Sequence, residues 1–207
     1  MIRGPRYKIC RMVGDKIYPQ CQTPKYAANE ATRGEKGGPG KKRFGGKSEY
    51  GVQLTEKQKA RYTYGITERQ FSNEVKNAHE NGGKNAALFL WKSLENRLDN
   101  VVFRIGLASS RAAARQMVSH GHITVNGIRV TTPSYKVAMG EIIAVRGGSR
   151  ASALFQNIKE RAIGVTVPAW LTVDFEKLEA KVLGEPVMGD AAMSLNLPVV
   201  LEFYSRA

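Results

Sequence analysis

The middle of the chain carries apolar residues at the spacing of a helix. Phe71, Val75 and Ala78 recur at intervals of four and three, which places them on one helical face. A further helical stretch is predicted from about residue 85 to Gly106, where a glycine ends the pattern. Its apolar positions are Leu88, Trp91, Leu94, Leu98, Val101, Val102 and Ile105.

Capping residues indicate where the preceding helices begin and end. Ser48 is a suitable N-cap for a helix that runs to about Thr63, and Gly65 suits its C-terminal end. Thr67 and Gln70 have the spacing of a capping box, in which each side chain accepts a hydrogen bond from the other residue's backbone N–H. Residues 48–96 are therefore predicted to form a helical domain.

Shorter elements are predicted beyond Gly106. Ser109 or Ser110 is placed to cap a short helix that runs to His120, and Gly121 is placed to stop it. The sequence leaves open which of the two serines is the cap.

An alternating pattern then predicts strands. His122–Val125 alternates polar and apolar residues, Asn126-Gly127 favours a tight hairpin turn, and Ile128–Val130 forms the return strand. Further strands are predicted at Glu141–Val145, Ala169–Val173 and Val199–Tyr204, and a helix at 149–161. The fold class is therefore α+β: residues 97–161 pack helices on a small, mainly antiparallel sheet, and residues 162–207 add strands and a segment that packs back on the body.

Residues 1–47 lack apolar periodicity and are rich in Gly, Pro, Lys and Arg, above all between 33 and 47. Such a segment buries too little apolar surface to offset the entropy lost on ordering. We therefore expect a basic, irregular arm that is extended and becomes ordered only on RNA.

The charge of the chain points to a polyanionic partner. The net charge is +14, with +8 in residues 1–50, +6 in residues 51–130 and zero in residues 131–207. An anion-binding surface is thus expected on the first two thirds. No apolar stretch is long enough to span a bilayer, so no membrane partner is expected.

Arginines recur on single faces of the two helices that are predicted before the hairpin at residues 122–130. Arg111, Arg115 and Ser119 are four apart, and Arg97 and Arg104 are seven apart, opposite apolar positions. Guanidinium forks suit phosphate geometry, which favours RNA binding. Charge alone does not exclude ordinary solvated helix faces.

The stretch Arg97–Val130, RLDNVVFRIGLASSRAAARQMVSHGHITVNGIRV, resembles the RNA-binding fold named after ribosomal protein S-four. That fold also occurs in some pseudouridine synthases, a tyrosyl-tRNA synthetase appendage and a heat-shock RNA binder. Three further segments are similar to the bacterial-type ribosomal protein S-four (uS-four) family: Tyr50–Phe71 (YGVQLTEKQKARYTYGITERQF), Trp170–Asp174 (WLTVD) and Leu201–Arg206 (LEFYSR).

The resemblance implies a structural protein of the small ribosomal subunit in the cytoplasm. Such proteins bind the five-prime domain of small-subunit ribosomal RNA, nucleate assembly there and influence translational accuracy. They lie beside ribosomal proteins S-three and S-five at the channel through which messenger RNA enters. The residues expected to face the messenger are Lys41, Lys42, Arg43 and Lys47.

The resemblance also implies which residues face ribosomal RNA. In the helical domain they are Tyr50, Gln53, Lys57, Lys59, Arg61, Tyr64 and Arg69. In the RNA-binding domain they are Arg97, Arg104, Ser110, Arg111, Arg115, Gln116, Ser119, His120, His122 and Asn126. Arg and Lys suit phosphates, Ser and Gln suit ribose hydroxyls, and Tyr or His can stack on unpaired bases, although buried tyrosines would equally serve core packing.

No metal, cofactor or catalytic site is expected. Many members of the family carry two cysteine pairs in the arm, and the matching positions here are Tyr7, Cys10, Cys21 and Tyr26. Two thiolates cannot complete a four-coordinate structural zinc site. A pseudouridine synthase would need a large catalytic domain after the RNA-binding fold, and only about 60 residues follow it, so the chain is expected not to be an enzyme.

Overall fold

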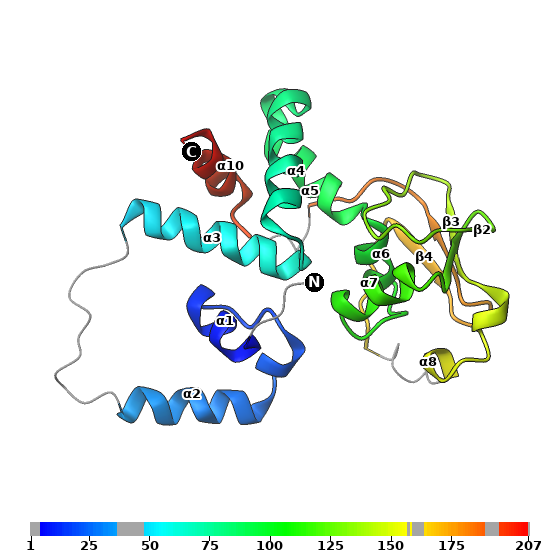
Figure 1. The fold of residues 1–207 in the computed structure, drawn as a ribbon, viewed down its shortest axis with the longest axis horizontal. Coiled ribbons are helices and arrows are strands. Elements are labelled where there is room, and N and C mark those ends of the chain that lie inside the picture. Colours follow the sequence, from blue (N-terminus) through cyan, green and yellow to red (C-terminus); the bar gives the residue numbers. More distant parts are fainter. Residues whose placement is uncertain (1–4, 37–47, 157, 159–163, 189–194, 207) are drawn as a thin grey trace. The chain divides into compact units, whose positions relative to one another are not determined.

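A computed structural model describes residues 5–36, 48–156, 158, 164–188 and 195–206 (Figure 1). The chain divides into two compact units, residues 1–79 with 193–207, and residues 80–192. We call them the helical unit and the sheet unit. They divide near residue 80, whereas the boundary placed from sequence was at residue 96.

The helical unit combines helices from both ends of the chain. Its elements are α1 (Arg6–Val13), η1 (Pro19–Cys21), α2 (Pro24–Lys36), α3 (Glu49–Tyr64), α4 (Glu68–Asn81) and α10 (Leu197–Ser205). The predicted caps are confirmed: Ser48 Oγ accepts from Gly51 N–H at 3.2 Å, and Gly65 adopts the left-handed conformation with φ 64°. The capping box is also present, because Thr67 N–H donates to Gln70 Oε1 and Gln70 N–H donates to Thr67 Oγ1, at 3.2 and 3.3 Å.

The N-terminal segment corrects the prediction of an extended arm. Over residues 5–36 it forms α1, η1 and α2, and α1 buries Ile9, Cys10 and Val13. Cys21 and Tyr26 join Cys10 in a small buried cluster. The periodicity was hidden because α1 spans only two turns and charged residues surround its apolar positions. Residues 37–47, with the four expected messenger-facing residues, lie outside the described part of the chain.

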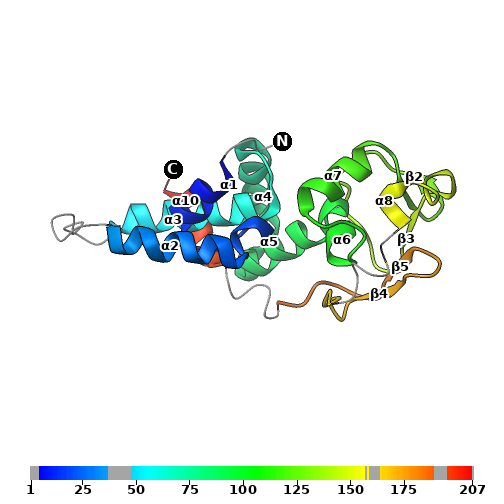
Figure 2. The same ribbon diagram turned by 90° about the horizontal axis from the view of Figure 1, so that it is seen from below.

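The predicted strand Val199–Tyr204 is a helix, α10. Asn196 Oδ1 accepts from Val199 N–H at 3.4 Å, and Pro198 lies in the first turn, where its missing N–H has no cost. Within the helical unit α10 packs along α3 (Figure 2). The β-branched and aromatic residues suggested a strand, but Leu197, Val200, Leu201 and Phe203 are buried at a helical spacing. Tertiary packing therefore overrides local propensity here.

A carboxylate ties α10 to α3 and α4. The Glu68 carboxylate accepts from Lys57 Nζ at 2.8 Å, from Arg61 Nη1 at 3.1 Å and from the Tyr204 hydroxyl at 2.6 Å. Burial alone would raise the pKa of Glu68, but these hydrogen bonds and the two positive charges outweigh it and lower the pKa. Lys57 Nζ also lies 4.8 Å from the centre of the Phe203 ring.

This contact predicts that the attachment of α10 weakens in acid. Because the pKa of Glu68 is lower in the folded chain, its ionised form stabilises the fold above the ordinary glutamate pKa of about 4.3. That contribution to stability disappears as the pH falls through the lowered pKa that Glu68 has in the folded chain. We expect the protection of α10 amides from hydrogen exchange to fall as the pH is lowered below about 4.3 in the parent chain, and to change less in Glu68→Gln.

Glu202→Gln is the matched control, since Glu202 lies on α10 but is exposed. It should keep the acid response of the parent chain. An identical acid response in the parent chain and Glu68→Gln would contradict the role given to Glu68.

The sheet unit packs helices on an antiparallel sheet of five strands. The strand order is β2-β1-β3-β5-β4, and every neighbouring pair is antiparallel. The strands are β1 (Ile123–Val125), β2 (Ile128–Arg129), β3 (Ile142–Val145), β4 (Leu171–Asp174) and β5 (Glu179–Val182). The other elements are η2 (Gly83–Asn85), α5 (Ala86–Glu95), α6 (Leu98–Arg104), α7 (Arg111–Ser119), η3 (Gly147–Ser149) and α8 (Ala153–Gln156).

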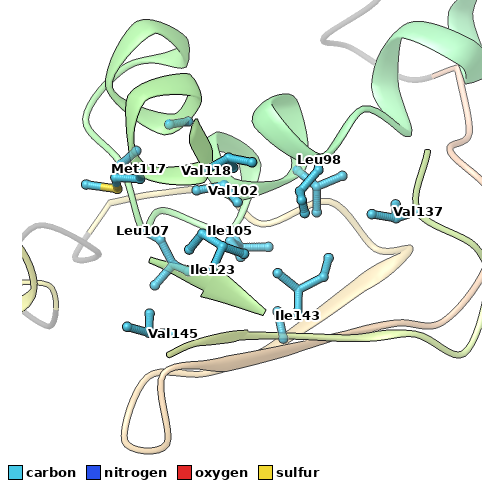
Figure 3. Close-up of a cluster of buried hydrophobic side chains, with 14 of the residues drawn as sticks. Leu98, Val102, Ile105, Leu107, Met117, Val118, Ile123, Val137, Ile143 and Val145 are labelled. Carbon is cyan, nitrogen blue, oxygen red and sulfur yellow. The ribbon is translucent and has the colours of Figure 1, made fainter. Parts of the chain in front are cut away.

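The core of this unit lies between the helices and one face of the sheet. Leu98 and Val102 of α6, and Ile105 directly after it, project toward Ile123 and Ile143 of the strands (Figure 3). All five side chains are buried. The core thus fixes α6 against the sheet, and α7 packs against α6.

The hairpin turn is confirmed, one strand of the sheet was not predicted, and one predicted helix lies partly outside the described residues. Asn126 and Gly127 both have positive φ, 51° and 80°, as a type I′ turn requires. Strand β5 was not predicted: Glu179–Val182 does alternate charged and apolar residues, but over only four positions, which is a weak signal. The helix expected at 149–161 is described only as α8 and Ile158, since residues 157 and 159–163 lie outside the described part.

The long helical stretch from residue 85 to 106 is interrupted. Arg97, between α5 and α6, is extended with φ −64° and ψ 133°, and forms an isolated bridge with Lys136. Leu98 N–H donates to Tyr135 O at 2.8 Å, and Asp99 N–H donates to Pro133 O at 3.1 Å. These long-range bonds replace helical ones, and the apolar pattern gives no sign of them.

Within the described residues, no helix has the length and apolar character needed to cross a membrane.

Candidate nucleic-acid interface

Four arginines gather around the start of α6 and along α7. We call them the guanidinium cluster: Arg97, Arg104, Arg111 and Arg115. Three side chains at the end of α5 and the start of α6 accept their hydrogen bonds, and we call them the acceptor row: Glu95, Asp99 and Asn100. All seven residues belong to the sheet unit.

Asp99 binds two of the arginines. Arg97 forms two parallel bonds with it, Nε to Oδ1 at 3.1 Å and Nη2 to Oδ2 at 3.0 Å. Arg115, from α7, donates its Nε to Asp99 Oδ2 at 2.8 Å and its Nη2 lies 2.7 Å from the same oxygen. One carboxylate therefore orients two guanidinium groups from different elements.

Asn100 and Glu95 hold the other two arginines. Arg111 Nε donates to Asn100 Oδ1 at 2.8 Å, while the Asn100 amide donates to Glu95 Oε2 at 2.9 Å. Arg104 forms a fork on Glu95, Nε to Oε2 at 2.9 Å and Nη2 to Oε1 at 2.8 Å. The Arg111 guanidinium also lies 4.6 Å from the centre of the Phe103 ring. The hydrogen bonds thus link Arg97, Asp99 and Arg115 in one group, and Arg111, Asn100, Glu95 and Arg104 in another.

The network is layered, with the acceptors beneath the arginines. The side chains of Glu95 and Asp99 are 2% and 3% exposed, whereas those of Arg104 and Arg115 are 17% and 18% exposed. Four guanidinium groups and two carboxylates leave a surplus of two positive charges. A partly exposed, rigidly held positive surface of this kind suits phosphate groups.

Arg97 does not belong to the exposed part of this surface. Its side chain is 3% exposed and lies before α6, so it does not share a helix face with Arg104 as predicted. The sequence-based prediction that Arg97 faces RNA does not fit its burial. Its place is beneath the surface, where it fixes Asp99.

The C-terminal end of α7 extends the surface with polar side chains. Gln116, Ser119 and His120 are exposed. Arg129, which was not predicted as a site residue, is exposed on β2 and donates to His120 O at 3.3 Å. A Cβ on Gly121 would lie 2.0 Å from Arg129 Nε, and Gly121 has φ 73°, so this approach requires glycine. Ile128, the other residue of β2, is exposed as well, so the alternation of the return strand does not single out Arg129.

Three predicted contacts have structural roles in the chain. Ser110, and not Ser109, caps α7 by accepting from Ala113 N–H at 3.3 Å. His122 Nδ1 lies 3.0 Å from Ser149 Oγ. Asn126 Oδ1 accepts from Ile142 N–H at 2.9 Å and ties the hairpin to β3.

The candidates in the helical unit divide into buried and exposed side chains. Gln53, Lys57 and Tyr64 are 4%, 8% and 2% exposed, which does not fit the prediction that they face RNA. Tyr50 is 63% exposed, and Arg69 is exposed on α4.

Two further predicted contacts of the helical unit are engaged in ion pairs. Lys59 pairs with Asp15 at 2.9 Å, and Arg61 pairs with Glu68 at 3.1 Å. Both side chains are partly buried, so they strengthen the unit as well as adding positive charge.

Comparison with known proteins covers almost the whole chain. Residues 96–143 match the S4 domain, and residues 1–95 match the ribosomal protein S4/S9 N-terminal domain. Small ribosomal subunit protein uS4 of Thermus thermophilus is 46% identical over 206 residues, with 98% of each chain covered. The uS4 protein of Halothermothrix orenii is 43% identical over 209 residues, with 99% of this chain and 98% of the relative covered.

The chain belongs to the uS4 family.

Membership of the uS4 family confirms the resemblance and the α+β fold class. The match of residues 1–95 separates the chain from other classes of protein that carry the S4 domain alone. It is therefore a small ribosomal subunit protein, and not an enzyme.

Tyr7, Cys10, Cys21 and Tyr26 occupy the positions that match the two cysteine pairs of the family resemblance. These four residues lie close together. The Tyr7 and Tyr26 rings stack with centroids 5.4 Å apart, and Cys10 and Cys21 are buried beside them. Burial, followed by a hydrogen bond with Cys10, raises the pKa of the Cys21 thiol to about 12. In the described part of the chain, no group of three or more His, Cys, Asp or Glu could hold a metal ion.

We predict that the purified chain carries no stoichiometric zinc. The two thiols at these four positions supply only half of the ligands that a four-coordinate structural zinc site requires. Elemental analysis after dialysis against zinc should find far less than one zinc per chain. A variant with Tyr7→Cys and Tyr26→Cys should bind about one zinc, because it supplies four thiols. One zinc per parent chain would contradict the prediction.

Proposed function

We propose that this uS4 family member binds small-subunit ribosomal RNA through the surface formed by α6, α7 and the β1–β2 hairpin. The observation that carries the proposal is the guanidinium cluster, in which Arg104, Arg111 and Arg115 are partly exposed above buried acceptors. Their excess positive charge matches a polyphosphate backbone. The family's place in the small subunit and its S4 domain support ribosomal RNA as the ligand.

The chemistry of the surface suits a folded RNA. Guanidinium forks donate two parallel hydrogen bonds to one phosphate, which fixes orientation as well as supplying attraction. Gln116 and Ser119 are placed to contact ribose hydroxyls or phosphates, and the exposed His120 ring is placed to stack on an unpaired base. Arg129 continues the positive surface onto the hairpin.

The specific RNA region and the neighbours that we propose for the chain rest on the family resemblance. The proposed RNA is the five-prime domain of small-subunit ribosomal RNA, where early binding would nucleate assembly. Ribosomal proteins S-three and S-five and incoming messenger RNA are the proposed neighbours, with an influence on translational accuracy. The exposed Tyr50 and Arg69 of the helical unit are proposed as further RNA contacts.

Quantitative binding to two RNAs tests the proposal. The full chain should bind a transcript of the five-prime domain at least about tenfold more tightly than a structured transcript of equal length from another part of the same ribosomal RNA. Filter binding at several salt concentrations measures both affinities. Equal affinities for the two transcripts would exclude specific recognition and leave only general attraction to polyanions.

A further inference from the structure

We propose that the acceptor row positions the arginines for RNA: Asp99, Asn100 and Glu95 hold the guanidinium groups of Arg115, Arg111 and Arg104 in the orientation that RNA phosphates require. The inference rests on the proposed function. It assigns a role in binding to buried residues, two of them acidic, that themselves present almost no surface to a ligand.

The geometry supports positioning over simple charge neutralisation. Each of the three arginines uses its Nε to bind an acceptor, at 2.9, 2.8 and 2.8 Å for Arg104, Arg111 and Arg115. A bond to Nε fixes the plane of the guanidinium group as well as its position. The acceptors are fixed in turn, because Asp99 is held by two bonds from the buried Arg97 and Asn100 is held by Glu95.

Positioning matters because free arginine side chains are flexible. Immobilising one rotamer-rich side chain at an interface costs roughly 0.5–1.5 kcal/mol, or about twofold to twelvefold in affinity. A side chain that is already held in the free protein avoids most of this cost. The acceptor row should therefore increase affinity for an RNA whose phosphates match the fixed pattern, and not for RNA in general.

Electrostatics alone predicts the opposite sign. Asp99 carries a negative charge beneath a surface that binds a polyanion, so Asp99→Asn removes a repulsion and raises the net charge by one. If charge were all that mattered, the substitution would strengthen binding to every RNA. If Asp99 positions Arg115, the substitution should weaken binding to the matching RNA while leaving general attraction intact or stronger.

The experiment compares Asp99→Asn with Glu179→Gln on two RNAs, the five-prime domain transcript and a homopolymer. Glu179 belongs to the same unit and pairs with Arg150 at 3.2 Å. Its neighbour Ala180 faces the core, so the Glu179 side chain lies on the sheet face away from α6 and α7. Both substitutions remove one negative charge, and only Asp99→Asn disturbs the acceptor row.

We expect Asp99→Asn to bind the five-prime domain about threefold to tenfold more weakly than Glu179→Gln, with no loss on the homopolymer. Equal or tighter binding of Asp99→Asn to the five-prime domain would overturn the proposal. An equal fall on both RNAs would also overturn it, because that marks a general loss of the surface.

A second variant keeps the proposal testable if Asp99→Asn folds poorly. Arg115→Lys retains the positive charge and Asp99, but lacks the planar fork that Asp99 holds. It should show the same threefold to tenfold loss that is confined to the five-prime domain. Unchanged affinity would count against positioning.

A further double variant distinguishes a failure of the proposed RNA binding from a failure of the positioning role. Arg111→Ala with Arg115→Ala removes the contacts themselves, so normal binding of that variant would refute the proposed function. Weakened binding of that variant, together with tighter binding of Asp99→Asn, would leave the proposed function standing and refute the positioning role.

Discussion

Replacing Arg111 and Arg115 together with alanine is expected to flatten the salt dependence of RNA binding. Each phosphate neutralised by an arginine releases condensed counterions, and contributes about 0.7–0.9 to the slope of log affinity against log salt. If both side chains contact phosphates, the slope should fall by about 1.5 and affinity for the five-prime domain should drop at every salt concentration. Filter binding of the full chain at several salt concentrations measures this.

The structure changes what the same substitution should do to stability. Sequence alone suggested exposed arginine faces and little loss. Arg115 in fact binds the buried Asp99, and Arg111 binds Asn100, so the double variant should lose about 1–2 kcal/mol of stability. Asp99 keeps its pair with Arg97, which limits the damage.

The matched control is Arg150→Ala with Lys177→Ala, which removes two positive charges from exposed sites in the same unit. It should leave the salt slope near that of the parent chain. If both double variants flatten the slope equally, total charge governs binding and not the α6–α7 surface.

Arg97→Ala is expected to destabilise the sheet unit by about 3 kcal/mol. Arg97 and Asp99 are each 3% exposed and joined by two bonds, so the substitution removes two buried charge-assisted hydrogen bonds, each worth about 1.5–3 kcal/mol, while Asp99 keeps its pair with Arg115. Both tryptophans of the chain, Trp91 and Trp170, are buried in this unit, so urea unfolding followed by tryptophan fluorescence reports on it alone.

Arg150→Ala serves as the control, because it breaks an exposed ion pair and should change stability by less than about 0.5–1 kcal/mol. RNA binding by folded Arg97→Ala, measured well below its unfolding transition, should show an unchanged salt slope. A lowered slope with parent-like stability would restore Arg97 as a phosphate contact.

Part of the fold could be predicted from short segments of the sequence. Local signals were sufficient wherever a bond closes within a few residues: the Ser48 cap, the Thr67–Gln70 box and the Asn126-Gly127 turn were all predicted and are all present. Helical periodicity also found the core of α4 and of α6.

Signals that depend on distant partners were missed. Nothing near Arg115 in the sequence shows that Asp99, sixteen residues earlier, lies beneath it. The extended backbone at Arg97 depends on bonds to the segment around Tyr135, so the pattern suggested an unbroken helix. For the same reason α10 was taken for a strand, since its helical form depends on packing against α3. The family resemblance indicated the surface that we propose binds RNA, but it did not distinguish the side chains proposed to contact RNA from the buried residues that support them.

The placement of α10 bears on the order in which the chain folds during its own synthesis. Translation delivers α1 to α4 first, then the whole of the sheet unit, and α10 last. The sheet unit is one uninterrupted segment, so it can fold as soon as it has emerged. The helical unit has to wait, with the side of α3 that packs against α10 uncovered, until Leu197, Val200 and Leu201 arrive. The newborn protein should thus acquire its arginine surface before its helical half is closed.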